Sequence, residues 1–217
     1  MTNKQKVITF GMVGLFVLGV VISILTYQGL TPNDEQVSDI KKQAQSYIEE
    51  NFSSEYKITD SFYDNVDVYD TFTYAAVVES DQDDRFRFLV FEHNETDELT
   101  DSYVAESFEY ELESVLRPKL NEAFGEDQLQ ELWLTYPKDA GMQLGINYKQ
   151  VPSVKEVDLK PIIRVTLDRG KNEDDEKKLN QIIEEVQNEL NISGGHVTLS
   201  FNDNAIIFKD KDIRKEF

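Results

Sequence analysis

Cysteine is absent from this chain of 217 residues, and histidine occurs only at positions 93 and 196. The lack of cysteine excludes a disulfide framework and a thiolate nucleophile. It also prevents His93 and His196 from completing the usual metal-ligand sets, so we interpret both as ordinary surface or structural residues. We therefore predict no catalytic residues, no metal ligands and no cofactor.

Motifs that would indicate a particular chemistry are also missing. No G-x-S-x-G sequence marks a nucleophile elbow, and no D-x-[DN]-x-[DN]-G loop marks a calcium site. We interpret the acids around Asp83 as a solvated hairpin turn and those around Asp174 as a helix start, where negative charge is favoured by the helix dipole. Three acid clusters exist all the same: Asp64, Asp67 and Asp70; Asp81, Asp83 and Asp84; and Glu173, Asp174, Asp175 and Glu176.

Positive charge is scarce, since 22 basic residues stand against 42 acidic ones and the net charge is −20. Two of the lysines and none of the acids lie in residues 1–30, so the rest of the chain carries a net charge of −22. Such a charge opposes binding to nucleic acid and to anionic lipid surfaces. It favours cationic partners, but the simpler interpretation is that it serves solubility or adaptation to a salty or alkaline exterior.

One long apolar run stands out near the start of the chain. Residues 7–27 contain no charged side chain and, as a helix, would extend about 31 Å, which is close to the thickness of a bilayer core. The run is too long for a secretory signal peptide, and no A-x-A-like cleavage site follows it. We predict a transmembrane anchor over residues 7–30, with its apolar contacts to lipid made by Val7, Phe10, Leu15, Phe16, Leu18, Ile22, Leu25 and Tyr27.

The flanking charges predict the orientation of this anchor. Lys4 and Lys6 precede the run, whereas Asp34, Glu35 and Asp39 follow it. Because positive residues are retained in the cytoplasm, residues 1–6 are predicted to be cytoplasmic and the C-terminal region extracytoplasmic. The expected location is the cell membrane, crossed once.

The exported region alternates between helical and strand patterns. We expect helices at about 34–51, at 102–124 with a kink or break at Pro118, and at 174–190. Strands are expected at 56–58, around Val66 and Val68, and at 72–78, 85–92, 130–136, 142–149, 161–168, 196–201 and 205–209. The order predicts an α+β fold in which antiparallel sheets pack with three amphipathic helices. The pattern also allows two α+β subdomains, 31–125 and 126–217, which meet near Gly125.

Residues 36–92 open with a helix that ends in Tyr47-Ile48 and continue with aromatic strands. This start resembles small membrane-anchored extracytoplasmic modules of Gram-positive bacteria, including PepSY-like and cystatin-like modules. The resemblance implies a binding or regulatory module and carries over no functional residue.

Three functions remain open from the sequence. The favoured one is a non-enzymatic, membrane-anchored module that binds another membrane or envelope protein with a basic surface, or a wall component. A second is a sensor or inhibitor that captures cationic peptides or metal ions. The third is an envelope hydrolase that uses two carboxylates as general acid and base.

Overall fold

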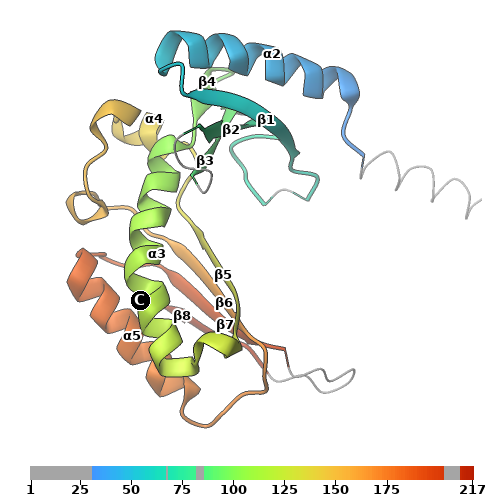
Figure 1. Ribbon diagram of the computed structural model, residues 1–217. Helices are drawn as coiled ribbons and strands as arrows, with labels where there is room; N and C mark the ends of the chain where they lie inside the picture. Colours follow the sequence, from blue (N-terminus) through green and yellow to red (C-terminus); the bar gives the residue numbers. More distant parts are fainter. Residues whose placement is uncertain (1–30, 67, 82–85, 203–210) are drawn as a thin grey trace, which may run out of the picture.

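The computed structural model describes residues 31–66, 68–81, 86–202 and 211–217. These residues form two four-stranded sheets and four α-helices, and the predicted α+β class is confirmed (Figure 1). The predicted anchor, its eight named residues, and Lys4 and Lys6 lie outside the described residues. Within the described residues, no helix has both the length and the apolarity that crossing a bilayer requires.

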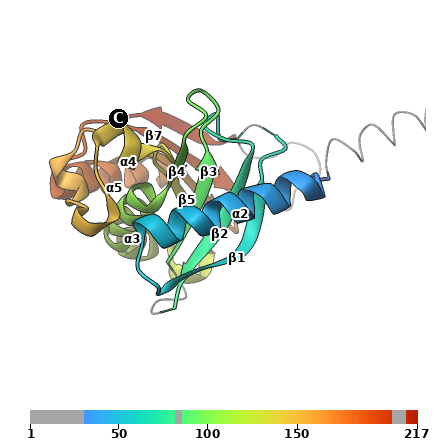
Figure 2. The same cartoon turned by 90° about the horizontal axis from the view of Figure 1, so that it is seen from above.

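The first sheet is antiparallel, with the strand order β1-β2-β3-β4. Helix α2 lies across one face of it (Figure 2) because its apolar stripe of Ile40, Ala44 and Ile48 is buried there. Asn33 caps this helix, since its side chain accepts from the backbone N–H groups of the first turn. The elements are α2 (Asp34–Asn51), β1 (Tyr56–Tyr63), β2 (Tyr74–Ser80), β3 (Arg87–Glu92) and β4 (Leu99–Asp101).

Helix α3 (Tyr103–Phe124) runs from the first sheet to the second (Figure 1) and contacts both β3 and β5. The sequence predicts a kink or a break at Pro118; the helix does not break there but continues to Phe124. Proline removes one backbone hydrogen bond, but Leu116 and Leu120 on either side of it are fully buried. Their burial holds the helix together through the proline, and Gly125, at φ 94°, ends it.

The second sheet has the order β5-β6-β7-β8 and contains one parallel pair, β6 with β7. Helix α5 joins these two strands as a crossover, which is why this pair departs from the antiparallel pairing that we expected. Helices α3 and α5 pack on each other over the largest core of the protein. The elements are β5 (Leu129–Thr135), β6 (Ile162–Leu167), α5 (Asp175–Leu190), β7 (His196–Phe201) and β8 (Ile213–Glu216).

Two of the predicted strands are wrong, and a third lies outside the described residues. Val66 and Val68 lie in exposed bends, because the buried Asp64 carboxylate accepts backbone N–H groups from this segment and turns it. The predicted strand 142–149 is instead α4 (Ala140–Leu144) followed by a 3-10 turn, with Gly145 in a left-handed conformation between them. The predicted strand 205–209 lies outside the described residues.

The segment after β5 folds back onto the first sheet. The ring of Tyr148 stacks on that of Phe52 at a centroid distance of 4.3 Å, and Tyr47 donates a hydrogen bond of 2.7 Å to Asp101 beside it. We call the stacking of Tyr148 on Phe52, together with the adjacent hydrogen bond between Tyr47 and Asp101, the closed junction. The two halves of the chain are therefore linked both by α3 and by aromatic packing, while the division near Gly125 into two subdomains stays a prediction.

Candidate functional site

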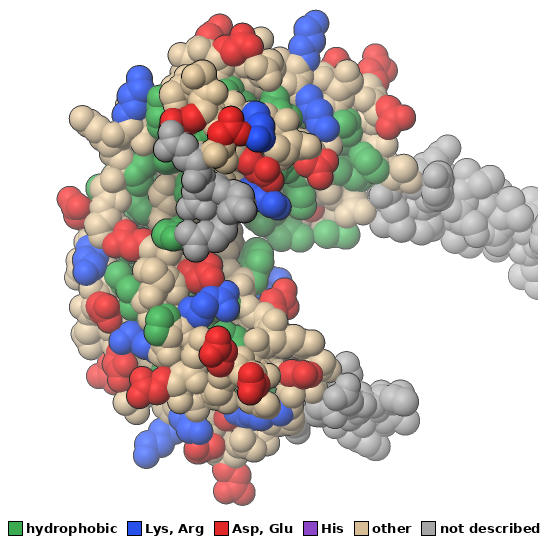
Figure 3. Space-filling view, viewed as in Figure 1, with side chains coloured by type: hydrophobic (Ala, Val, Ile, Leu, Met, Phe, Trp, Pro, Cys, Tyr) green, Lys and Arg blue, Asp and Glu red, His purple; other side chains and the backbone are tan. Residues whose placement is uncertain are grey.

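The molecule is hollowed on one side, between the half that contains the first sheet and the half that contains the second (Figure 3). A hollow of about 420 Å³ lies between β3, α3 and β5, and a neighbouring one of about 390 Å³ lies between the loops of the first sheet and the start of β6. Tyr69 and Lys138 line both. We call the two hollows together the waist cleft.

Exposed apolar side chains gather around the waist cleft. Phe62 and Tyr110 line the first hollow and are 37% and 51% exposed. Val68 and Ile162 line the second and are 50% and 39% exposed. These are four of the seven large hydrophobic side chains exposed among the described residues. Such a concentration is typical of an interaction site, whereas scattered single residues would need no explanation.

A buried ion-pair cluster forms the floor of the first hollow. The ammonium group of Lys138 lies 2.7 Å from a Glu106 oxygen and 2.9 Å from a Glu109 oxygen, although the lysine side chain is only 5% exposed. Glu109 also accepts the backbone N–H of Tyr136, and Glu106 accepts the hydroxyl of Ser102. The three charged groups are therefore held in place by the fold.

The pKa of Glu109 is raised to about 8, chiefly because burial removes water from the carboxylate. The negative charge of Glu106 raises it further, while Lys138 opposes both effects. Burial alone would lower the pKa of Lys138, but the two carboxylates outweigh it and hold that pKa above its ordinary value. One lysine thus faces two acids in a largely buried cluster, and protonation of Glu109 relieves the excess negative charge.

A buried histidine lies in the second hollow. The Nδ1 atom of His93 accepts the backbone N–H of Glu95, which places the ring hydrogen on Nε2. That Nε2 lies 3.4 Å from Asp139, whose carboxylate also accepts the side-chain amide of Gln143. Both ring nitrogens of His93 therefore face protein groups, which is the arrangement of a structural histidine. His196, by contrast, is exposed on β7, 3.8 Å from Glu216.

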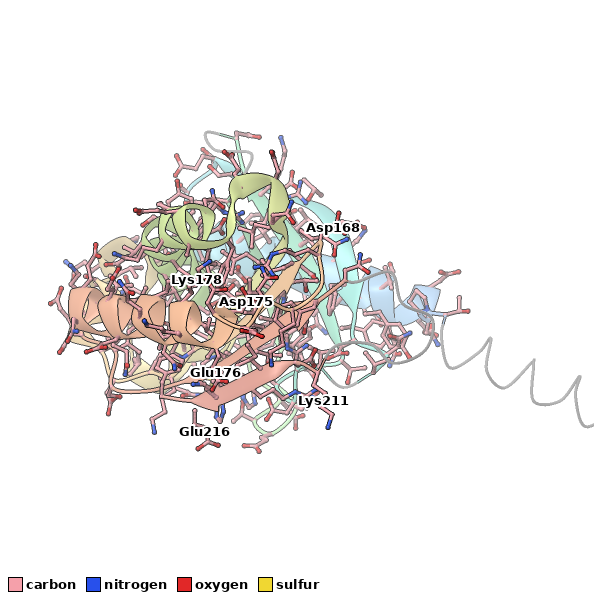
Figure 4. All side chains as sticks on the ribbon, turned by 90° about the horizontal axis from the view of Figure 1, so that it is seen from below. Asp168, Asp175, Glu176, Lys178, Lys211 and Glu216 are labelled. Carbon is pink, nitrogen blue, oxygen red and sulfur yellow. The ribbon has the colours of Figure 1, made fainter. Side chains whose placement is uncertain are left out.

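The acid clusters of the sequence are dispersed or neutralised. Asp64 shapes a turn and Asp81 pairs with Lys57, while residues 67, 83 and 84 lie outside the described residues. Figure 4 labels Asp175, Glu176 and Lys178 at the start of α5, where three of the four acids of the cluster are in ion pairs: Asp174–Lys178, Asp175–Arg169 and Glu176–Lys215. Within the described part of the chain, no group of three or more acids or histidines is placed to hold a metal ion.

The residues of the waist cleft carried little signal in the sequence. Glu106 and Glu109 are three positions apart on α3, a spacing that places both on one side of the helix beside the buried stripe. Lys138 follows in a turn about thirty residues later, and nothing local connects it to either acid. In the sequence, the cluster of Lys138 with Glu106 and Glu109 is indicated only by the two glutamates beside the apolar stripe of the helix.

No known family model matches the sequence, and no curated protein is similar to it. The fold is similar to the crystal structure of a DUF5037 family protein from Ruminococcus gnavus, with a TM-score of 0.41 and 15% sequence identity. That similarity covers 76% of this chain and 75% of the other chain.

Proposed function

We propose that this chain is a non-enzymatic, membrane-anchored, extracytoplasmic binding module whose waist cleft docks another membrane or envelope protein. The membrane anchor and its orientation rest on the sequence of residues 1–30 alone. The expected partner has a basic surface, because residues 31–217 carry a net charge of −22.

The observation that carries the proposal is the gathering of exposed apolar side chains around one concave site. Phe62 and Tyr110 are exposed, whereas the other aromatic side chains among the described residues are buried or partly buried. Apolar rings that are exposed to water are unfavourable in free energy. A docked partner would remove their apolar area from water.

The polar groups of the cleft support binding more than catalysis. A general base needs a lone pair that can reach a substrate proton. The carboxylates of Glu106 and Glu109 already accept hydrogen bonds from Lys138, and both nitrogens of His93 face protein groups. These groups are arranged to stabilise the cleft.

Co-purification with matched variants tests this proposal. The tagged full chain would be recovered from its own cells in mild detergent as wild type, as Phe62→Glu and as Leu144→Glu. Phe62 and Leu144 are both 37% exposed, but only Phe62 lines the cleft. We expect a partner that is retained by wild type and by Leu144→Glu and lost from Phe62→Glu. Equal recovery with both variants, or no partner at all, would refute the docking role.

A paired-carboxylate hydrolase is the second candidate, because the raised pKa of Glu109 next to Glu106 is the pattern that separates a general acid from a base. Isolated cell walls incubated with the full chain test it. Release of soluble fragments by wild type, abolished in Glu109→Gln with no loss of folding, would establish hydrolysis. An unchanged wall would exclude this candidate for wall substrates.

A further inference from the structure

We propose that the waist cleft takes an extended peptide segment of the partner, rich in alternating apolar and basic residues, which adds as a strand to the free edge of β5. This inference rests on the proposed function, since it specifies how the partner docks in the cleft. It also gives a chemical identity to the segment that would be bound.

The first observation is that β5 presents an edge to the cleft. It is an edge strand of its sheet, and within the described residues no strand pairs with its outer side. Leu132, Trp133 and Leu134 line the first hollow consecutively. A strand that offered only one face would contribute alternate residues, because successive side chains point to opposite faces. Three in succession indicate that the strand edge itself borders the hollow.

An unpaired edge of this kind is a template for another strand. Its outward N–H and C=O groups need partners, and an added peptide supplies them along its whole length. The first hollow provides the room, at about 420 Å³. The opposite wall includes Phe86 and the first three residues of β3, Arg87–Leu89, where β4 does not reach because it pairs only with residues 90–92.

The second observation is the apolar lining on both sides of that edge. Phe62 packs edge-on against Tyr69, with ring centroids 6.0 Å apart, and the two rings form one wall. Tyr110 of α3 and Trp133 of β5 lie around the same hollow. An added strand directs alternate side chains to opposite sides, so its apolar residues would contact these rings.

The third observation is charge. Glu106, Glu109 and Glu113 line the hollow against two cations, Arg87 and Lys138. These groups are already paired with one another or with neighbours: Arg87 with Glu79 at 2.8 Å, Glu113 with Arg117 at 2.7 Å, and Lys138 with the two acids of the floor. The attraction for a basic segment therefore comes chiefly from the net charge of −22 on residues 31–217. With the acidic surface around it, the cleft attracts a basic segment and repels an acidic one.

Trp133 makes this proposal measurable, because it is the single tryptophan of the chain. The Arg164 guanidinium lies over its ring at 4.7 Å, so the indole already sits in a defined environment whose disturbance changes its emission. Tryptophan fluorescence of the unmodified full chain therefore reports on the surroundings of Trp133 in the cleft.

The experiment titrates the full chain in detergent with the synthetic peptide Lys-Val-Lys-Phe-Lys-Val-Lys. An acidic version with Glu for Lys and a backbone N-methylated version serve as matched probes. We expect a saturable change in Trp133 emission with the basic peptide, weakened by salt. We also expect binding of the N-methylated and acidic versions to be at least about tenfold weaker, because one loses backbone hydrogen bonds and the other is repelled. Phe62→Glu should abolish the change and Leu144→Glu should preserve it.

Three outcomes would overturn the inference. Equal binding of the N-methylated peptide would exclude strand addition, and equal binding of the acidic peptide would exclude the charge requirement. A spectrum that depends on protein concentration without peptide would identify a second copy of this chain as the occupant. None of these results alters the co-purification test with Phe62→Glu, so the proposed docking role can survive the failure of this inference.

Discussion

The two halves of this protein meet in two different ways on two sides of α3. At the closed junction, Phe52 and Tyr148 stack at 4.3 Å and Phe52 is 9% exposed. At the waist cleft, Phe62 and Tyr110 are 37% and 51% exposed. The same kind of side chain is covered by the chain itself on one side and left accessible on the other. A hollow of about 450 Å³ also lies at the closed junction and is lined by Phe52 and Tyr148. The two sides therefore differ in the exposure of their aromatic rings, and this difference is the reason to propose the waist cleft as the docking side.

The largest expected effect comes from the floor of the waist cleft. Lys138→Met should lower the free energy of unfolding by about 3–5 kcal/mol above pH 8, where Glu109 is ionised, because it leaves two partly buried carboxylates without their counter-ion. Urea unfolding of the full chain in detergent measures this. Lys119 is a matched control, since it also pairs with two glutamates, Glu185 and Glu189, but at the surface. Lys119→Met should unfold close to wild type, and equal losses in both variants would show that burial of the cluster does not matter.

The next effect belongs to the closed junction. Phe52→Ala should cost about 3 kcal/mol, because it removes a ring that packs against Tyr148 and Phe88 and leaves a cavity. Chemical unfolding again provides the measurement. A loss below about 1 kcal/mol would mean that the ring stacking does not hold the halves together.

A pH dependence should originate from Glu109. Its pKa in the folded chain, about 8, lies above its ordinary value of 4.5, so the folded state binds more protons between those values. Stability contributed by the protonated carboxyl is therefore fully present below the ordinary pKa and is lost as the pH rises to about 8. Glu109→Gln should reduce the slope of unfolding free energy against pH in this window, by at most about 1.4 kcal/mol per pH unit. An unchanged slope would assign the pH dependence to other groups.

Replacement of Phe62 should have the smallest effect on stability and the largest effect on partner binding. Phe62→Ala should change the free energy of unfolding by less than about 1 kcal/mol, since the side chain is already partly in water. Thermal unfolding should place it near wild type, while partner recovery should fall. Loss of stability comparable to that of Phe52→Ala would instead make Phe62 a core residue.

The helices and most strands follow from local patterns. The stripe from Phe108 to Leu120 predicts α3, and the β-branched run Ile162–Leu167 predicts β6, because each pattern has the period of its element. The segment after Asp64 is an example in which the local pattern does not predict the structure. Its buried carboxylate turns the segment after β1 through backbone hydrogen bonds, so the alternation of Val66 and Val68 does not become a strand.

The waist cleft could not be predicted, because its residues are brought together only by the fold. Phe62 belongs to β1, Tyr110 to α3 and Lys138 to the turn after β5. Each of them has an ordinary sequence environment. What the sequence does contain is the acidity of residues 31–217 and the absence of catalytic motifs, and both remain part of the proposed function.

Site-specific photo-crosslinking in intact cells tests the docking role of the waist cleft most directly. A photoreactive phenylalanine would replace Tyr110 in the cleft and, as the control, Leu144 outside it. We predict a discrete crosslinked species from the Tyr110 position that is absent from the Leu144 position. Crosslinks from Leu144 alone, or the same products from both positions, would contradict the role of the waist cleft as the docking site.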